Sequence, residues 1–566
     1  MAWREVILRM LVPLKELVDL YRRMQQDASS LKSSILILAA ADVDSLAALQ
    51  ILTALFRADC MQYAVIPMLS LSQMLETLQA LEKSATTPTS IVCLNCGATC
   101  DLSATWPILN ELNCYILDCH RPVHHSNAHS QRVKLVDDQT DRNLDNLPRP
   151  GEFEEANQED QPVSSESESE ATAEPRKRAH AEIEERMQKR VKIETYYSGS
   201  YFGTSVAWLM FELAKQMNRE NNEMLWMALV GITEQLVHLK VDKFQFEQRC
   251  KEAQADILRL NPQLDAEEAA FPELGRVSIE LKELRVMLLR HWTLYDSLYY
   301  SNIVAARLGT WKQQGRDKFH GVLVKLGVSL KDAQQLYTFL PHKAELKARA
   351  MECLPQFELD ELLCTSYLKQ YDLRTQFSSA DVVYAVAALL ESPESEASAG
   401  FWQAHDALSS LELLQRGAQL AIDLHKAVFA LGTSLIEKKA VNPTNDFRYA
   451  IINNDSWEQA RFFHFPYALK RLCVFLMEAY KHQRTSIRAK PMVLAMVNSK
   501  RNVYLVIGVM DYESAGRNTF RARFDEAVEA SQAQNRTDFF EGELIEVSKD
   551  NFPAFMDALT NDRDHY

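Results

Sequence analysis

The stretch LKSSILILAAADVDSLAALQILTAL, residues 31–55, decides the fold of this chain. Ile35–Ala40 is an uninterrupted apolar run, which is typical of a strand buried on both faces. From Ser45 onward apolar residues recur at helical spacing and predict a helix. Asp42 and Asp44 therefore follow the carboxyl end of a buried strand, where open α/β sheets place their ligand sites.

The alternation of strand and helix continues through the first 136 residues. After the opening unit the apolar patterns predict a helix at 72–82 and strands at 62–68, 91–94, 115–117 and 133–136. Strands that alternate with helices indicate βαβ units and a mostly parallel sheet. The fold class expected from this pattern is α/β.

Polar side chains follow three of these predicted strands. Asp42 and Asp44 follow the first, Asn95 follows the strand at 91–94, and Asp118 and His120 follow the strand at 115–117. Carboxyl ends of parallel strands share one edge of a sheet, so these side chains are expected to lie near one another. Carboxylates in such a place can hold two divalent cations for phosphoester hydrolysis.

A zinc site is the alternative for the same region, which is rich in thiol and imidazole side chains. The candidates are Cys93, Cys96, Cys100, Cys119, His120, His124 and His125. Their spacing lacks the paired Cys-x2-Cys frame of structural zinc sites, and Cys93 falls inside a predicted strand.

Composition limits the remaining function classes. With 566 residues the chain is expected to form two to four domains. Its net charge of −15, from 62 basic and 77 acidic residues, argues against a surface that coats DNA throughout. Apolar runs stay short of a membrane span, and the charged N-terminus is unlike a signal peptide. The ten cysteines are interpreted as reduced thiols of the cytosol or nucleus.

An acidic and then basic segment interrupts the first part of the chain at 137–195, and we expect it to be disordered. Residues 151–175 include nine acidic residues and no basic ones. Serines among the acids at 164–169 are candidate phosphorylation sites. Basic clusters at 176–178 and 189–192, joined by a predicted helix at 179–189, have the composition of a nuclear import signal.

The remainder alternates between helical and mixed patterns. A glycine-containing loop at 198–205 precedes a helical pattern at 206–217 and a buried run at 224–230. Helices are then expected from 237 to 390, with Leu284–Tyr300 as the clearest. The end of the chain predicts a loop at 393–400, a helix at 404–435, paired strands at 492–497 and 503–509, a helix at 520–533 and a strand at 544–547.

Several of these strings, in this order, resemble the DHH phosphoesterases of the RecJ exonuclease superfamily and, more closely, the cell division control protein 45 family. The supporting strings are ADVDSLAALQIL (41–52), LNCGATCDL (94–102), LDCHRPVHHSN (117–127), SGSYFGTSVAWLMFELA (198–214), NEMLWMALVGITEQLV (222–237), HWTLYDSLYYSNIVAARLGTW (291–311) and SSADVVYAVAALLESPE (378–394). They spread over most of the chain, and the insertion lies where that family has one.

The resemblance implies a domain organisation. It places a DHH-like domain at 1–136 and 196–236, separated by the insertion at 137–195. A helical interdomain region at 237–392 and a C-terminal DHH-associated-like α/β domain at 393–566 would follow.

The resemblance also implies a role in DNA replication in the nucleus. Members of the family join the minichromosome-maintenance ring and the GINS complex to form the active replicative helicase. Origin-loading factors, the DNA polymerase machinery and single-stranded DNA are further expected partners, and a membrane is not. The chain lacks the Gly-x4-Gly-Lys-Ser/Thr loop of an ATP-driven motor, as expected for a subunit that is not the motor.

Departures from the active phosphoesterases indicate a degenerate site. Active enzymes have Asp where Asn95 stands, and Asp-His-His where Asp118-Cys119-His120 stands. Their later Asp is Glu234 here, and the glycine-rich phosphate motif is reduced to residues 515–518. We therefore expect no enzyme activity, no cofactor, no metal and no catalytic residue. The vestigial metal-site positions are Asp42, Asp44, Asn95, Asp118, His120 and Glu234.

Two alternatives stay open at these positions. The aspartates can instead cap the following helix and accept backbone N–H groups. A residual single-metal site, or a metal-dependent exonuclease or phosphoesterase, is the competing interpretation. Arg121, Arg517, Arg521 and Arg523 lie near the expected interdomain groove and are candidates for contacts with the DNA backbone.

Overall fold

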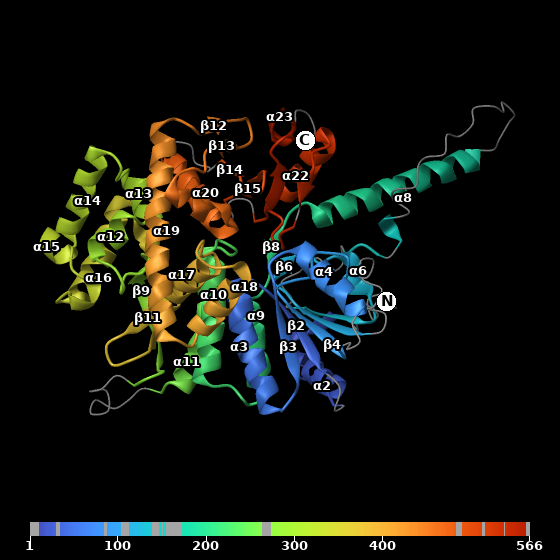
Figure 1. Cartoon of the computed structure of the whole chain (residues 1–566), viewed down its shortest axis with the longest axis horizontal. Coiled ribbons are helices and arrows are strands. Elements are labelled where there is room, and N and C mark those ends of the chain that lie inside the picture. The colour runs from blue at the N-terminus through green and yellow to red at the C-terminus, as the bar shows by residue number, and fades with distance from the viewer. Residues whose placement is uncertain are drawn as a thin grey trace.

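The computed structural model of the chain contains three sheet-based parts, which Figure 1 shows side by side. It describes residues 11–29, 34–83, 88–102, 112–137, 147–149, 151–153, 173–262, 273–482, 490–511, 516–536 and 538–561. A six-stranded sheet forms the first part, a small three-stranded sheet lies in the middle, and a second six-stranded sheet lies near the C-terminus.

The first sheet is parallel throughout, as the sequence pattern predicts. Its strand order is β1-β7-β5-β4-β2-β3. The strands are β1 (Leu11–Pro13), β2 (Ile35–Ala40), β3 (Tyr63–Met68), β4 (Ser90–Leu94), β5 (Asn113–Leu117) and β7 (Val133–Asp137). Every residue of β2 is buried, because β3 and β4 flank it and apolar clusters cover both of its faces. The α/β fold class is thereby confirmed.

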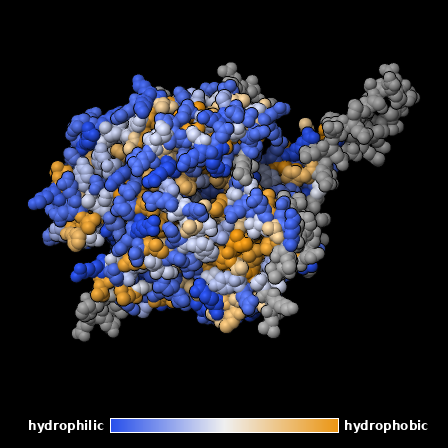
Figure 2. All heavy atoms as spheres, viewed as in Figure 1, coloured by the Kyte–Doolittle hydropathy of each residue, from blue (hydrophilic) through white to orange (hydrophobic). Residues whose placement is uncertain are grey.

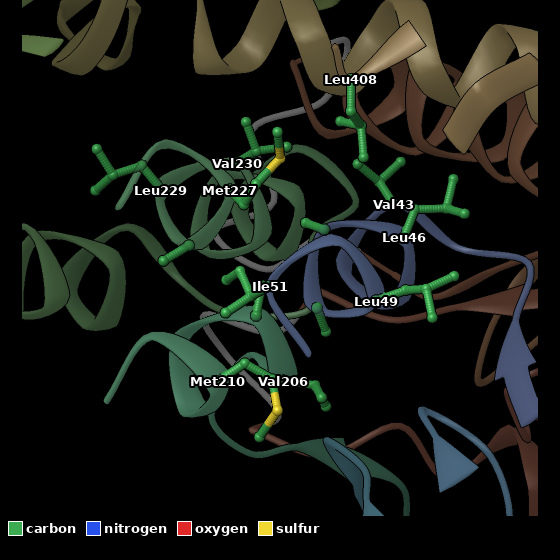
Figure 3. Close-up of a cluster of buried hydrophobic side chains, with 14 of the residues drawn as sticks. Val43, Leu46, Leu49, Ile51, Val206, Met210, Met227, Leu229, Val230 and Leu408 are labelled. Carbon is green, nitrogen blue, oxygen red and sulfur yellow. The ribbon is translucent and has the colours of Figure 1, made fainter. Parts of the chain in front are cut away.

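Helices cover both faces of this sheet. On one face lie α2 (Leu17–Asp27), α3 (Val43–Ala58), α9 (Val206–Gln216) and α10 (Asn222–Val237). On the other lie α4 (Leu71–Glu82) and α6 (His125–His129). Figure 3 shows how side chains of α3, α9 and α10 interdigitate and reach Leu408. Helices α3, α9 and α10 are hydrophobic nearly all round because each is enclosed by neighbours.

The sequence at Val6–Met24 has an amphipathic helical pattern interrupted by Pro13, and the structure differs from a helix over this whole span. Residues 1–10 lie outside the described part, and β1 and the short 3-10 turn η1 (Leu14–Glu16) precede α2. Pro13 lacks a backbone N–H and cannot continue a helix through its position. The segment before it instead pairs in parallel with the edge strand β7.

The middle region contains strands that the sequence pattern did not predict. Strands β9 (Val277–Leu284), β10 (Leu363–Gln370) and β11 (Gln376–Ser378) form an antiparallel sheet within the span expected to be helical. Its helices are α11 (Lys243–Leu260), α12 (Leu294–Tyr299), α13 (Asn302–Leu308), α14 (Gln313–Lys325), α15 (Leu330–Ala333) and α16 (Lys343–Cys353).

In the same middle region, the prediction of a helix over Leu284–Tyr300 is wrong. Leu284 ends β9, Leu288 has a left-handed φ of 52°, and helical structure begins only at Leu294. The apolar spacing of this stretch arises because its side chains enter two separate clusters from a turn.

The C-terminal part returns to mixed structure. Its sheet has the order β12-β13-β14-β15-β17-β16, and the expected strands at 492–497 and 503–509 pair antiparallel as β14 and β15. The elements are α17 (Ser379–Leu390), α18 (Ala397–Ala407), α19 (Leu411–Glu437), β12 (Asn442–Pro443), β13 (Arg448–Ile452), α20 (Pro466–His482), β14 (Met492–Asn498), β15 (Val503–Val509), α22 (Phe520–Ser531), β16 (Asn535–Arg536), β17 (Leu544–Ser548) and α23 (Phe552–Asn561). The single helix expected at 404–435 is two helices, since Ser410 caps α19 and ends the continuity.

The segment expected to be disordered at 137–195 is structured in part. Its basic half belongs to helix α8 (Ala173–Tyr197), which projects from the body in Figure 1. Residues 138–146, 150 and 154–172 lie outside the described part. Between them Leu147 joins an apolar cluster and the Phe153 ring stacks on His125 at 4.3 Å. Good helix formers and an ion pair of 2.9 Å between Glu185 and Lys189 account for α8.

Polar and charged side chains dominate the face of the molecule in Figure 2, with an apolar patch in the region of β2 and β3. Strand β3 is an edge strand, and Tyr63, Val65 and Ile66 are only half-buried. None of the helices within the described ranges is long and apolar enough to cross a membrane.

Gly231 fixes how closely α10 approaches α3 and α9. A Cβ atom at this position would collide with the Asp44 carboxylate, the Ser205 hydroxyl and the Ala207 methyl group. We therefore expect Gly231→Ala to lower the free energy of unfolding by ~2–3 kcal/mol through overpacking, measured by urea denaturation. The control Gly321→Ala in α14, where no atom lies within 4 Å, should raise it by ~0.5–1 kcal/mol. If Gly231→Ala and Gly321→Ala changed the free energy of unfolding equally, the close approach of α10 to α3 and α9 at Gly231 would be contradicted.

Candidate functional site

Asp42 is the N-cap of α3 and lies at the carboxyl end of β2. Its backbone is extended, and its Oδ1 atom accepts a hydrogen bond of 2.8 Å from the Ser45 backbone N–H. The Ser45 hydroxyl donates to Oδ2 at 3.0 Å. Burial raises the pKa of this carboxyl group, and the positive charge of Lys240 opposes the rise. The capping role expected as an alternative for Asp42 is confirmed.

Asp44 lies two residues further on, in the first turn of α3, and joins α3 to the start of α9. Its carboxylate accepts hydrogen bonds from the backbone N–H groups of Val206 at 2.8 Å and Ala207 at 3.0 Å, and from the Ser205 hydroxyl at 2.5 Å. These donors form the first turn of α9, whose partial positive charge favours an anion. Asp44 is fully buried, and both of its carboxylate oxygens accept hydrogen bonds from α9.

Asn95 bridges the two aspartates. Its Nδ2 atom donates to Asp42 Oδ1 at 3.2 Å and to Asp44 Oδ2 at 3.0 Å. Its Oδ1 atom accepts from the Cys119 backbone N–H at 3.1 Å, which fixes the orientation of the amide. The residue has a left-handed φ of 51°, a conformation that Asn tolerates better than most residues. The amide hydrogens therefore point at the carboxylates and satisfy them.

Asp118 and His120 form a second, closed pair at the end of β5. His120 Nδ1 lies 2.7 Å from Asp118 Oδ1, and Asp118 also accepts the backbone N–H groups of Ala98 and His120. Burial acts against both charged forms, but the mutual attraction prevails: it lowers the pKa of Asp118 and raises the pKa of His120. Strand β6 (His120–Arg121) holds the pair in place by pairing with β8 (Tyr201–Phe202).

Lys240 supplies a buried positive charge at the centre of the site, which sequence reasoning missed. Its Nζ atom lies 3.0 Å from Glu234 Oε1, 3.4 Å from Glu541 Oε1 and 5.3 Å from the centre of the Phe202 ring. Burial lowers the pKa of Lys240, but Glu234 and the other nearby anions outweigh it and raise the pKa well above its usual value. Burial raises the pKa of Glu234 to about 7, against the attraction of Lys240.

The charge network continues into the C-terminal part. Lys470 of α20 lies 3.6 Å from Glu541 and forms a close ion pair with Glu543. Asn518 donates to Glu543 through its Nδ2 atom at 2.7 Å. Burial raises the pKa of Glu541, but Lys470 and Lys240 outweigh it and hold the pKa below its usual range. Alternating acids and amines thus connect α10 to the turn that precedes β17 (Leu544–Ser548).

The six vestigial positions are brought together, but they do not fit a divalent cation. The amide N–H groups of Asn95 occupy oxygen atoms of Asp42 and Asp44 that a metal would need. A Lys240 ammonium lies beside Glu234. Hard cations require several free oxygen ligands in suitable geometry, and this donor set offers them poorly.

Several of the zinc candidates are used by protein groups, although His120 Nε2 and His124 Nδ1 are buried without a hydrogen-bond partner among the described residues. Within the described ranges Asp118, Cys119 and His120 form the one group of three ligand atoms lying within 4.8 Å of one another. Burial raises the pKa of the Cys119 thiol well above its usual value, so it is protonated. Cys96 donates to the Leu38 carbonyl, and Cys100 to the Gly97 carbonyl. The zinc alternative gains no support from this arrangement.

The four candidate arginines occupy different environments. Arg121 is buried and donates to the carbonyl oxygens of Asp118 and His120, so it is unsuited to a surface contact with DNA. The Arg517 guanidinium lies over the Tyr201 ring at 4.7 Å, where the C-terminal part meets β8. Arg521 is exposed on α22. Arg523 lies 4.0 Å from Asp446.

Comparisons with known proteins agree on one family. A family model described as CDC45 matches residues 35–182 and 151–562. The chain is 27% identical to the cell division control protein 45 homolog of Schizosaccharomyces pombe, over 97% of this chain and 99% of that one. It is 29% identical to the Mus musculus homolog, over 93% and 96% of the two chains. The crystal structure of CDC45 from Entamoeba histolytica shares the fold, with a TM-score of 0.71, 20% identity and coverage of 97% and 99%.

Asn95→Asp tests whether the amide satisfies the aspartates. The change removes both donated hydrogen bonds and adds a third carboxylate to a buried site. We expect a loss of ~3–5 kcal/mol in the free energy of unfolding at neutral pH, measured by denaturant titration. The matched control is Asn113→Asp at the other end of the sheet, where the amide is half-buried and also donates to a carboxylate, that of Asp27. A smaller loss at Asn95 than at Asn113 would refute this role.

Glu234→Gln tests the buried ion pair through the pH dependence of stability. The pKa of Glu234 rises from 4.5 to about 7 on folding, so the folded state binds an extra proton between these values. The contribution of Glu234 is therefore favourable below pH 4.5 and is lost as pH rises to about 7. The stability of wild type relative to Glu234→Gln should fall by on the order of 2–3 kcal/mol across that window. The exposed Glu412 gives the control variant Glu412→Gln. If the difference in stability between wild type and Glu234→Gln did not change with pH, the raised pKa of Glu234 would be refuted.

Proposed function

The chain belongs to the cell division control protein 45 family, and on that premise we propose that it is a non-catalytic subunit of the replicative helicase. It is a DNA replication factor. In the proposed role it joins the minichromosome-maintenance ring and the GINS complex in the nucleus. Origin-loading factors and the DNA polymerase machinery are the further proposed partners.

The position of Lys240 is the observation that carries the non-catalytic part of this proposal. A metal-dependent phosphoesterase needs carboxylates that are free to bind cations and activate water. Here the ammonium of Lys240 balances Glu234 and Glu541, and the Asn95 amide bonds Asp42 and Asp44. The acidic residues are engaged in holding the chain together, which supports a scaffold rather than a hydrolase.

The same network supports a role as a rigid platform. Asp44 connects α3 to α9, Lys240 connects α10 to Glu541, and Lys470 connects Glu541 to α20. A buried network of ion pairs and hydrogen bonds restrains the elements that share it. The first sheet and the C-terminal part are thereby held in a fixed relation, and such a body can present surfaces to several partners at once.

Two further features support parts of the proposal. The basic clusters at 176–178 and 189–192 lie on α8, which projects from the body and suits a nuclear import signal. Arg517 lies over the Tyr201 ring, where the C-terminal part meets β8, and Arg521 is exposed four residues further on, in α22. An arginine beside an aromatic ring, with a second arginine close in sequence, suits the backbone and bases of single-stranded DNA.

Assembly is the direct test of the proposed role. A tagged chain incubated with nuclear extract should retain minichromosome-maintenance and GINS subunits at moderate salt, identified by mass spectrometry, because the role requires a stable complex. The tag alone is the control. Recovery of the tagged chain without any replication protein would contradict the proposal, as would ATP turnover that co-elutes with the pure chain.

Single-stranded DNA tests both the contact and the absence of hydrolysis. We expect the chain to bind a fluorescent oligonucleotide without cutting it in Mg²⁺ or Mn²⁺, measured by anisotropy and gel analysis. Replacing Arg517 and Arg521 together by Gln should weaken binding about tenfold and reduce the salt slope by about 1.4, at ~0.7 for each phosphate contact.

Arg523→Gln is the matched control for this pair. Arg523 lies on the same helix as Arg521 but faces Asp446, so its loss should leave binding nearly unchanged. Metal-dependent cleavage that disappears in Asp42→Ala with Asp44→Ala would favour the exonuclease alternative. If Arg523→Gln weakened DNA binding as much as the double variant, the contact assigned to Arg517 and Arg521 would be refuted.

A further inference from the structure

A cavity of about 210 Å³ lies where the end of α10 meets α13, α17, α19 and α20. It adjoins the acidic centre through Lys470, which lines it, whereas none of the six vestigial positions nor Lys240 does. Apolar side chains such as Met287, Met477 and Met510 form part of its wall, and Arg471 and His238 add polar groups. The cavity thus combines an apolar body with a polar end.

Arg471 brings an unsatisfied guanidinium to this cavity. Its two terminal nitrogens are buried, and neither has a hydrogen-bond partner within the described part of the chain. The group lies over the Tyr384 ring, with its central carbon 4.8 Å from the ring centre. An unpaired buried donor costs free energy, and an unpaired buried charge costs more. The Arg471 guanidinium is therefore expected to have a partner that the described part of the chain does not supply.

His238 adds a second unsatisfied group to the same wall. Its Nε2 atom is buried and has no partner among the residues described. Its ring packs 4.6 Å from the ring of Tyr467. Burial and the positive charge of Arg471 lower its pKa well below the usual value, so the ring is neutral. Two polar groups therefore face one cavity without acceptors or donors to meet them.

Four carboxylates line the cavity, those of Asp242, Glu361, Glu478 and Asp511. Glu361 pairs with Arg307, Asp511 lies 3.6 Å from Lys481, Asp242 caps α11, and Glu478 also interacts with another group of the chain. Glu391, outside the cavity, is the carboxylate that influences the charge of Arg471, and it accepts the N–H groups of Tyr467 and Ala468. Burial raises the pKa of Glu391 to about 8, so it is mostly neutral at pH 7.

We propose that this cavity binds a small organic anion whose oxyanion group, a carboxylate or a phosphate, pairs with the Arg471 guanidinium. A planar guanidinium presents two parallel N–H donors that match two oxygens of such a group. The His238 ring lies beside it as a second polar contact, and the methionine wall covers the apolar body of the ligand. Flexible methionines adapt to ligands of irregular shape.

Thermal unfolding of the full chain with benzoate tests the site, with the neutral benzamide as the paired probe and sodium chloride to match ionic strength. Benzoate should raise the melting temperature, because a ligand that binds only the folded state stabilises it, and benzamide should not. Phenyl phosphate in place of benzoate distinguishes a phosphate site from a carboxylate site. No shift with either anion would overturn the proposal.

Arg471→Met removes the guanidinium while keeping an apolar side chain over Tyr384, and it should abolish the response to benzoate. Its melting temperature without ligand should equal or exceed that of wild type, since an unsatisfied buried charge is lost. The control Arg461→Met removes a guanidinium that is exposed over Phe462, and the response should persist.

A second variant covers the case in which Arg471→Met fails to fold. Arg471→Lys keeps the charge but loses the paired donors, and calorimetric titration should show affinity for benzoate at least about tenfold weaker than wild type. Unchanged affinity in Arg471→Lys, or an unchanged thermal response in folded Arg471→Met, would overturn the assignment.

Discussion

The burial of one ammonium group among carboxylates is the constraint on which this structure depends. Lys240 is completely buried, and its charge is offset by Glu234 and Glu541 at 3.0 and 3.4 Å. Removing either side of such an arrangement leaves an uncompensated buried charge, which costs ~3–5 kcal/mol. The fold therefore needs both the end of α10 and the segment before β17 in place together. The joint between the first sheet and the C-terminal part is electrostatic as well as apolar.

This constraint also explains how groups of the protein itself can balance an acidic site. Carboxylates at strand ends repel one another, and a hydrolase uses bound cations to relieve the repulsion. In this chain the relief comes from the protein itself: the Asn95 amide for Asp42 and Asp44, His120 for Asp118, and Lys240 for Glu234. Each of these groups is held by covalent connection to the fold. Loss of one of these groups would lower the stability of the fold.

Five of the six strands of the first sheet and the gathering of the polar positions at three strand ends could be predicted from the sequence, because local apolar runs and strand-end residues carry that information. Strand β1 could not, and Glu234, which lies on α10, was placed with them by the family resemblance. Lys240 could not, since in the string HLKVDK it looks like a surface lysine after a helix, and its partner Glu541 lies about 300 residues further on. Strand β9 escaped notice because Glu280, Lys282 and Glu283 give it the composition of an exposed helix. Helix α8 shows the opposite. Its segment is highly charged but forms a helix, because it contains residues of high helix propensity and an ion pair between residues four apart.

Charge balance separates two of the buried cationic sites. Lys240 and Lys470 have carboxylates within 4 Å, so protein groups balance their charges. Arg471 is the residue that follows Lys470 on α20, yet its terminal nitrogens have no such partner among the described residues. The same helix therefore carries one cation that is paired with carboxylates and, next to it, one that is not, and both line the cavity. A buried guanidinium without a carboxylate partner indicates that its charge is balanced from outside the chain.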